Sequence, residues 1–401
     1  MIKILKRLYY SFFYLLNLYK LRFLCKKRKI RVGFWVTESA KWTCQEFYDL
    51  LKSDDRFEPF ILLSYFKNPQ EGVNSEEHYN KIKTFFEQKG ANVIDTFNPE
   101  IFEFKNLNDF KADIIFYQQP WQININQRPE KTHKHSLLCY IPYCFYSMDS
   151  WINYLPKFHG LMWKYFVETS FHKEDYQKKY RAKNCVVSGS TKLDGYQNLD
   201  KHIIENIWKT KGKKRIIYAP HHSFNDNLHE VATFNKNGKY ILELAKSHPE
   251  IEWIFRPHPA FKNRVISNSI MSEEELEKYY QEWDKTGTVY TDSNYLEMFV
   301  SSDCLITDCI SFLTEYAPTG KPVLHLRKDN QKEEFNTLVS KIDDGYYQIY
   351  SNQELGEVFN QVIINNDDFL SEKRELNKVL LQTKTNANKN IYDFLVNTLF
   401  K

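Results

Sequence analysis

The sequence predicts an α/β protein made of two domains, each with a doubly wound parallel sheet, that face a cleft. The chain has 401 residues, of which 42% are hydrophobic, and this length suits two cores. From residue 31 onward, apolar strand-like runs alternate with helical stretches. The alternation restarts after the basic break "KTKGKKR" at 209–215. We therefore expect a basic amphipathic helix over 1–30, a Rossmann-like domain over 31–205 and a second Rossmann-like domain over 206–401.

The first segment is strongly basic. Residues 1–31 hold ten Lys or Arg and no acid, whereas the rest of the chain holds 45 bases against 51 acids. Its uncharged stretch "LYYSFFYLLNLY" is shorter than the roughly 20 residues that span a bilayer, and it lacks an A-x-A cleavage site. Aromatic and Leu side chains flanked by cations suit a helix lying on an anionic membrane surface. The alternative is a helix packed on its own domain. The concentration of positive charge at one end argues against a nucleic-acid partner.

In the first half, strands and helices follow each other in a regular order. The expected strands are "RVGFWV", "FEPFILLSYF", "ANVIDTF", "ADIIFYQQP", "SLLCYIPYCF", "KYFVETS" and "NCVVSGS". The expected helices include "SAKWTCQEFYDLLKS" and "SEEHYNKIKTFFEQKG", the second with acids in its first turn and Gly90 at its end.

The second half repeats this organisation. The expected strands are "IIYAPHH", "IEWIFRPHP", "GTVYTD", "SDCLITD" and "KPVLHLR", with helices at "NGKYILELAKSH" and "EEELEKYYQEW". The seven cysteines form no CxxC pair, and several lie in apolar runs, which favours reduced thiols in the cytosol over disulfides or a zinc site.

Polar side chains follow three strands of the second half. His221 and His222 follow "IIYAP", Arg256 and His258 follow "WIF", and Thr307 and Asp308 follow "CLI", with Ser311 opening the next helix. Ligands of such folds bind at the carboxyl ends of the strands. Arg forks onto phosphate oxygens, and His donates a hydrogen bond or a proton. These residues predict a site for an anion such as a nucleotide diphosphate. The plainer interpretation is that a lone strand-end His is an ordinary polar residue and that Thr307 and Asp308 form a helix cap.

The ordered segments "YAPHHS", "RPHP" and "SDCLITDCISFLTEYAPTGKPVLHL" resemble motifs of the CDP-glycerol glycerophosphotransferase family, whose members build teichoic acids and related capsule polymers. The third segment fits at Thr307, Asp308, Ser311, Glu315, Lys321 and Pro322, and "SGSTKLD" fits at Gly189 and Asp194. The resemblance covers about 140–330. It implies a GT-B fold, a membrane-bound acceptor, and no requirement for a metal or another cofactor.

Two departures from the family pattern concern catalysis. The family's Tyr-Ser-Ser reads Cys309-Ile310-Ser311, and the strand "CYIPYCF" lacks the His-Gly motif that supplies the expected general base. His159 in "HGLMWK" has the His-Gly-x-x-x-Lys spacing and is one candidate. His221, His222 and Asp149 are the other candidates.

The resemblance implies transfer of glycerol phosphate, or a similar polyol phosphate, from a CDP-linked donor to a membrane-linked glycan or polymer at the cytoplasmic face of the membrane. Donor-binding candidates are Gly189, Asp194, Arg256, Thr307, Asp308, Ser311 and Glu315, and catalytic candidates are His258, His221, His222 and His159. Two alternatives remain, a GT-B transferase that uses a nucleotide sugar and a non-catalytic partner in a capsule assembly complex.

Overall fold

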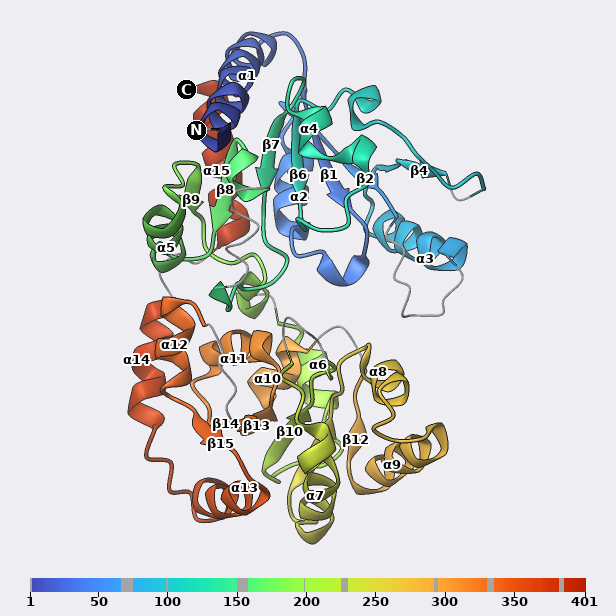
Figure 1. Ribbon diagram of the computed structural model, residues 1–401, viewed down its shortest axis with the longest axis vertical. Coiled ribbons are helices and arrows are strands. Elements are labelled where there is room, and N and C mark those ends of the chain that lie inside the picture. Colours follow the sequence, from blue (N-terminus) through green and yellow to red (C-terminus); the bar gives the residue numbers. More distant parts are fainter. Residues whose placement is uncertain are drawn as a thin grey trace. The chain divides into compact units, whose positions relative to one another are not determined.

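A computed structural model describes residues 2–65, 75–98, 100–149, 158–197, 199–224, 230–291, 295–329, 335–381 and 386–401. The chain divides into two compact units. Unit 1 comprises Met1–Asp194 and Thr383–Lys401, and unit 2 comprises Gly195–Gln382. Each unit has a central sheet with helices on both faces (Figure 1) and its own apolar core.

The sheet of unit 1 has seven parallel strands in the order β3-β2-β1-β6-β7-β8-β9. They are β1 (Ile30–Val36), β2 (Phe57–Leu63), β3 (Val93–Asp95), β6 (Ile114–Tyr117), β7 (Leu137–Tyr140), β8 (Lys164–Val167) and β9 (Cys185–Val187). All seven coincide with expected strands. The inner strands are almost wholly buried, as expected for parallel strands covered on both faces. A small antiparallel pair, β4 (Phe97–Asn98) with β5 (Glu103–Phe104), was not predicted.

The sheet of unit 2 has six parallel strands in the order β12-β11-β10-β13-β14-β15. They are β10 (Arg215–Ala219), β11 (Glu252–Phe255), β12 (Thr288–Val289), β13 (Cys304–Thr307), β14 (Val323–Leu326) and β15 (Tyr347–Ile349). The first five match expected strands, and β15 is additional. In both sheets the strand order reverses direction beside the first strand, which is the arrangement of Rossmann-like folds.

The helices connect these strands. In unit 1 they are α1 (Ile2–Leu24), α2 (Gln45–Ser53), α3 (Ser75–Gln88), α4 (Pro129–Thr132), α5 (Ser170–Tyr180) and α15 (Ala387–Phe400). In unit 2 they are α6 (Lys201–Asn206), α7 (Phe234–Ser247), α8 (Phe261–Ser267), α9 (Glu273–Thr286), α10 (Leu296–Ser301), α11 (Ile310–Tyr316), α12 (Thr337–Asp343), α13 (Asn352–Phe359) and α14 (Ser371–Leu381). No helix among the described residues is long and apolar enough to cross a membrane.

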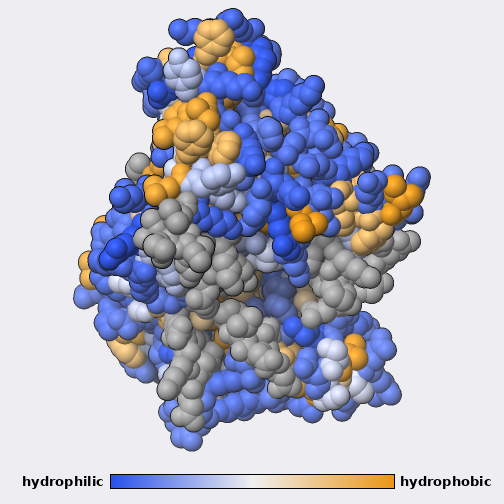
Figure 2. Space-filling view, turned by 45° about the horizontal axis from the view of Figure 1, so that its top comes forward, coloured by the Kyte–Doolittle hydropathy of each residue, from blue (hydrophilic) through white to orange (hydrophobic). Residues whose placement is uncertain are grey.

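The N-terminal helix α1 has two different apolar faces. Tyr10, Tyr14 and Leu21 are buried in unit 1, and the Tyr14 hydroxyl donates to the Leu161 carbonyl at 2.6 Å. The opposite face carries exposed Leu8, Phe12, Leu15, Leu16, Tyr19 and Phe23. Helix α1 lies beside α15 (Figure 1), and apolar side chains gather over this end of unit 1 (Figure 2). The helix is therefore part of unit 1, and its second apolar face is left uncovered by the described residues.

The division between the units differs from the expected boundary at 205/206. Helix α6 belongs to unit 2, where the Asp200 N–H bonds Glu297 and the Trp208 indole bonds Ser301. The basic break at 209–215 is a turn held by Glu252, which accepts from the Thr210 N–H and hydroxyl. The last helix, expected in the second domain, returns to unit 1.

Candidate active site

The candidate site is built at the carboxyl ends of three adjacent strands of unit 2. Strands β11, β10 and β13 are neighbours in the sheet, so the segments that follow them come together. The Arg256 N–H donates to the Tyr218 carbonyl at 2.8 Å, and the His258 N–H donates to the Pro220 carbonyl at 3.3 Å. These bonds continue the pairing of β10 and β11 just beyond the strands, and they align His221 and His222 with His258.

Three imidazoles form one cluster at this edge. The rings of His222 and His258 are stacked, with centroids 3.8 Å apart and an interplanar angle of 23°. The His221 ring lies 4.3 Å from His222 and 5.5 Å from His258. The Nδ1 atom of His221 lies 2.8 Å from the Ser223 hydroxyl. All three histidines are candidates from the sequence analysis, and the structure places them in one cluster.

The state of His258 follows from its surroundings. Its Nδ1 accepts a hydrogen bond from the Ala260 N–H at 3.1 Å, so the neutral ring carries its proton on Nε2. Burial, together with the neighbouring His222 and Arg256, lowers the pKa of His258 well below its ordinary value. The ring is therefore neutral near pH 7 and can donate one hydrogen bond from Nε2.

Arg256 places a buried positive charge next to the imidazoles. Its side chain is 7% exposed, and its guanidinium lies 4.8 Å from the Tyr295 ring centre and 5.3 Å from that of Phe312. Burial lowers the pKa of Arg256, but an arginine remains charged at any working pH. The contacts with two rings restrain the guanidinium. A restrained cation beside the neutral His258 imidazole is suited to binding phosphate oxygens.

Glu315 lies in the layer beneath this cation. Its side chain is buried on α11, where its carboxylate accepts a hydrogen bond from the Tyr295 hydroxyl and its carbonyl accepts one from Tyr196. Glu315 was named above as a donor-binding candidate. Its observed contacts are those of a residue that orients Tyr295, whose ring packs against the Arg256 guanidinium.

Thr307 and Asp308 hold the site together. The Asp308 carboxylate accepts from the His221 N–H at 2.6 Å, and from the N–H and hydroxyl of Thr233 at 2.6 and 2.8 Å. Thr307 donates to the Ala219 carbonyl at 2.6 Å and accepts from the Cys309 N–H. Burial raises the pKa of Asp308, and the three hydrogen bonds oppose this effect. Both side chains join β13 to the segment that carries the histidines, whereas Ser311 is half-exposed at the start of α11.

Gly189 and Asp194 belong to unit 1, whereas the three histidines of the cluster belong to unit 2. Gly189 follows β9 with φ +96°, a conformation that favours glycine. The Asp194 carboxylate accepts from the N–H groups of Ala387 and Asn388 and from the Asn388 side chain, at 2.8–2.9 Å. Asp194 was expected to bind the donor. Its observed contacts are those of a residue that fastens the start of α15.

His159 is a core residue. It has no exposed surface, and its ring packs against the rings of Tyr140 and Tyr165, with centroids 4.6 and 4.7 Å away. Burial lowers the pKa of His159 to about 3. A general base must contact the acceptor hydroxyl, so this burial argues against His159 in that role. The remaining first-half candidate, Asp149, pairs with Lys179.

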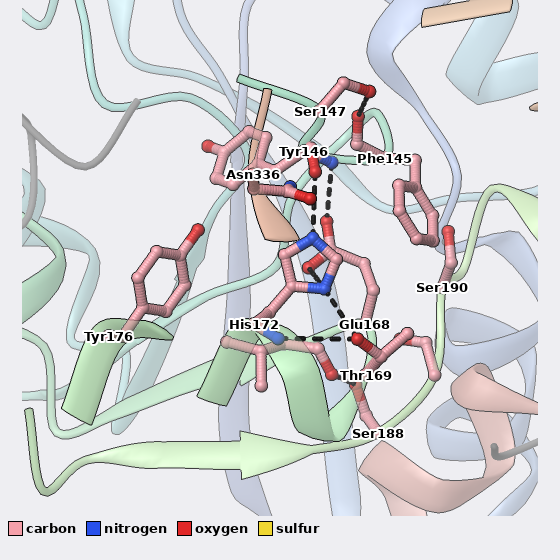
Figure 3. A network of polar contacts seen from close by, with 12 residues as sticks. Phe145, Tyr146, Ser147, Glu168, Thr169, His172, Tyr176, Ser188, Ser190 and Asn336 are labelled. Carbon is pink, nitrogen blue, oxygen red and sulfur yellow. Dashed lines mark hydrogen bonds and ion pairs between the residues drawn. The ribbon is translucent and has the colours of Figure 1, made fainter. Parts of the chain in front are cut away.

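The structure also shows a buried polar network in unit 1 that the sequence analysis missed (Figure 3). Glu168, directly after β8, accepts from the Tyr146 N–H at 2.9 Å. His172 lies 2.8 Å from both the Tyr146 carbonyl and the Thr169 hydroxyl. Burial raises the pKa of Glu168, and nearby His172 opposes this. The signal was present in "KYFVETS", where a carboxylate directly follows an apolar strand.

Comparison with family models supports the predicted resemblance over part of the chain. Residues 159–336, less than half of the sequence, match the family model described as CDP-Glycerol:Poly(glycerophosphate) glycerophosphotransferase. The matched segment contains the donor-binding candidates and the four candidate histidines named above, whereas Asp149 lies just before it. No curated protein matches this chain.

Solved structures similar to this chain confirm the GT-B-like fold. A variant of the wall teichoic acid polymerase TagF soaked with CDPG is 14% identical with a TM-score of 0.60, over 99% of this chain and 97% of the other. UDP-GlcNAc 2-epimerase from Neisseria meningitidis is 16% identical with a TM-score of 0.59, over 92% and 100%. MnaA from S. aureus with UDP is 14% identical with a TM-score of 0.60, over 93% and 97%.

Proposed function

We propose that the protein transfers glycerol phosphate, or a similar polyol phosphate, from a CDP-linked donor to a membrane-linked glycan or polymer in cell-surface polysaccharide synthesis. The observation that carries this proposal is the cluster of three imidazoles with a buried guanidinium close enough to lower the pKa of His258, at adjoining strand ends within the matched segment. An acceptor hydroxyl attacks the phosphorus of glycerol phosphate, and the bond to the CMP oxygen breaks. The acceptor's proton passes to a base, for which His221 and His222 are the imidazoles beside His258.

The residues of unit 2 supply positioning and neutralisation of charge, which is most of what phosphoryl transfer needs. Arg256 binds oxygens of the pyrophosphate with a guanidinium already fixed by two rings. His258 donates from Nε2 to a phosphate oxygen. After taking up a second proton on Nδ1, it protonates the departing CMP from Nε2. Asp308 keeps the His221 backbone in place while the charge on the phosphates is redistributed.

The donor is tested by nucleotide release from the purified protein, with water as the acceptor. We expect release of CMP from CDP-glycerol or CDP-ribitol and no release of UDP from UDP-sugars. Release of UDP alone would establish a nucleotide-sugar transferase instead. A protein that releases no nucleotide from any of these donors, with or without a glycan acceptor, would be a non-catalytic partner.

Arg256→Lys should raise the KM for the donor roughly tenfold or more, because lysine keeps the charge but loses the planar fork. The matched control is Arg215→Lys. Arg215 also stacks on a ring, at 5.5 Å from Trp208, but it begins β10 and so lies at the other end of the strand. The KM for the donor is measured by steady-state kinetics for each variant. An unchanged KM for Arg256→Lys would show that Arg256 does not bind the donor phosphates.

We also propose that the exposed face of α1 binds an anionic membrane surface, where a lipid-linked acceptor would lie. Its apolar side chains from Leu8 to Tyr19 lie between the basic residues Arg7 and Lys20, and Phe23 follows Arg22, which is the arrangement of an interfacial helix. Because the opposite face is built into unit 1, the test replaces surface residues instead of deleting the helix.

The triple variant Phe12→Ser, Tyr19→Ser, Phe23→Ser should lose most of its sedimentation with phosphatidylglycerol vesicles and keep its melting temperature. Added salt should weaken binding of the unaltered protein. Ile101 and Ile125 are exposed apolar residues elsewhere on unit 1, and their replacement by Ser is the control. If the triple variant sediments as well as the control, α1 does not contact the membrane.

A further inference from the structure

A groove of about 480 Å³ runs between α1 and the body of unit 1. Its volume falls in the range of small-molecule sites. Leu8 and Leu15 of α1 line one side, and Met162 and Trp163, just before β8, line the other. The groove is mainly apolar and is separate from the histidine cluster, which belongs to unit 2.

Four cations surround this groove. Arg7, Lys164, Arg181 and Lys183 are among its lining residues, and no carboxylate is. Among the ion pairs of the described residues, none involves any of these four. An apolar floor with a rim of one sign of charge complements a molecule that has an anionic head and a hydrocarbon chain.

The backbone at one rim residue adds to this assignment. Arg181 ends α5 in the left-handed conformation, with φ 51°. Glycine is the usual residue at such a helix end, because a side chain there costs free energy. Here Arg181 occupies the position where glycine is usual, and its cationic side chain lines the groove.

The groove is also continuous with the exposed stripe of α1. Leu8 and Leu15 belong to both, being 62% and 67% exposed while lining the groove. A chain held in the groove would therefore begin at the same surface as the apolar side chains of Phe12 and Tyr19. This continuity favours a lipid over a soluble phosphate or an acidic peptide.

We propose that the groove binds a single anionic membrane lipid. Its phosphate lies beside Arg7, Lys164, Arg181 and Lys183, and the first part of one chain lies against Leu8, Leu15 and Met162. The site is independent of the donor and of the reaction at the histidine cluster. It would set the orientation of unit 1 on the membrane instead of only attracting the protein to it.

The test uses the full-length protein and dioctanoyl phosphatidylglycerol as a soluble monomer, so that general attraction to a charged surface plays no part. Binding is followed by tryptophan fluorescence, because Trp163 lines the groove, and Trp163→Phe should abolish the signal. We expect saturable binding, with much weaker binding of dioctanoyl phosphatidylcholine and of inorganic phosphate.

Arg181→Ser with Lys183→Ser should weaken binding of this lipid roughly tenfold or more, the usual scale for losing charge-assisted contacts. Lys26→Ser with Lys27→Ser removes the same charge outside the groove and should change the affinity by less than about twofold. If the first double variant unfolds, Lys164→Ser provides the same test. Equal binding of the neutral lipid, equal binding of phosphate alone, or equal effects of the two double variants would overturn the proposal.

Discussion

Replacing His258 with glutamine should lower turnover of a CDP-linked donor by about 100-fold or more, the usual scale for loss of a general acid. Glutamine keeps an N–H donor near the position of Nε2, so donor binding should change by less than about threefold. The resting imidazole is neutral, because burial, His222 and Arg256 lower its pKa. A bound pyrophosphate brings negative charge next to the ring and raises that pKa. The ring then takes up a proton on Nδ1, which gives up its hydrogen bond from the Ala260 N–H, and it later donates the Nε2 proton to CMP.

This account predicts proton uptake when the donor binds. Calorimetry in two buffers with different ionisation enthalpies should show it for the unaltered protein and not for His258→Gln. His202→Gln, an exposed imidazole on α6, is the matched control and should behave as the unaltered protein does. If His258→Gln keeps most of its turnover, His258 only binds phosphate, and the proton transfer belongs to His221 or His222.

Acid should destabilise unit 1 through His159. Its pKa is about 3 in the folded protein and near 6.5 when unfolded, so the unfolded chain binds the extra proton. The stability is therefore fully present above about pH 6.5 and is lost as the pH falls toward 3. The loss from this residue amounts to roughly 3 kcal/mol by about pH 4.

His159→Phe keeps a ring packed against Tyr140 and Tyr165 but cannot take up the proton. Denaturant unfolding at about pH 7 and pH 4 should show a smaller loss of stability for this variant than for the unaltered protein, and donor turnover at pH 7 should be retained. The exposed His135→Gln is the control and should leave the acid loss unchanged. An inactive but folded His159→Phe would restore His159 as a candidate base.

The strands were predictable because each is a short apolar run bounded by polar residues, and buried parallel strands leave that pattern. Strand β15 (Tyr347–Ile349) was missed because Gln348 interrupts its apolar run. The gathering of His221, His222 and His258 was also predictable, since carboxyl ends of neighbouring parallel strands share one edge.

Contacts between distant parts of the chain could not be predicted in this way. Nothing near Asp194 shows that its partners are Ala387 and Asn388, and the spacing around His159 does not reveal the two rings that enclose it. Glu315 was placed on the correct helix, but Tyr295, which occupies its carboxylate, lies on another element.

The return of α15 to unit 1 has a consequence for how the protein matures on the ribosome. Ile391, Leu395 and Leu399 of α15 are buried in the core of unit 1. The N–H groups that bond to the Asp194 carboxylate belong to residues synthesised almost two hundred positions later. Domains usually fold from the N-terminus as synthesis proceeds. Here the first unit to begin is the last to be completed, because unit 2 emerges whole while unit 1 still lacks α15. A chain that stops before α15 should therefore release a folded second unit joined to a first unit with an open core, the kind of surface that chaperones and proteases recognise.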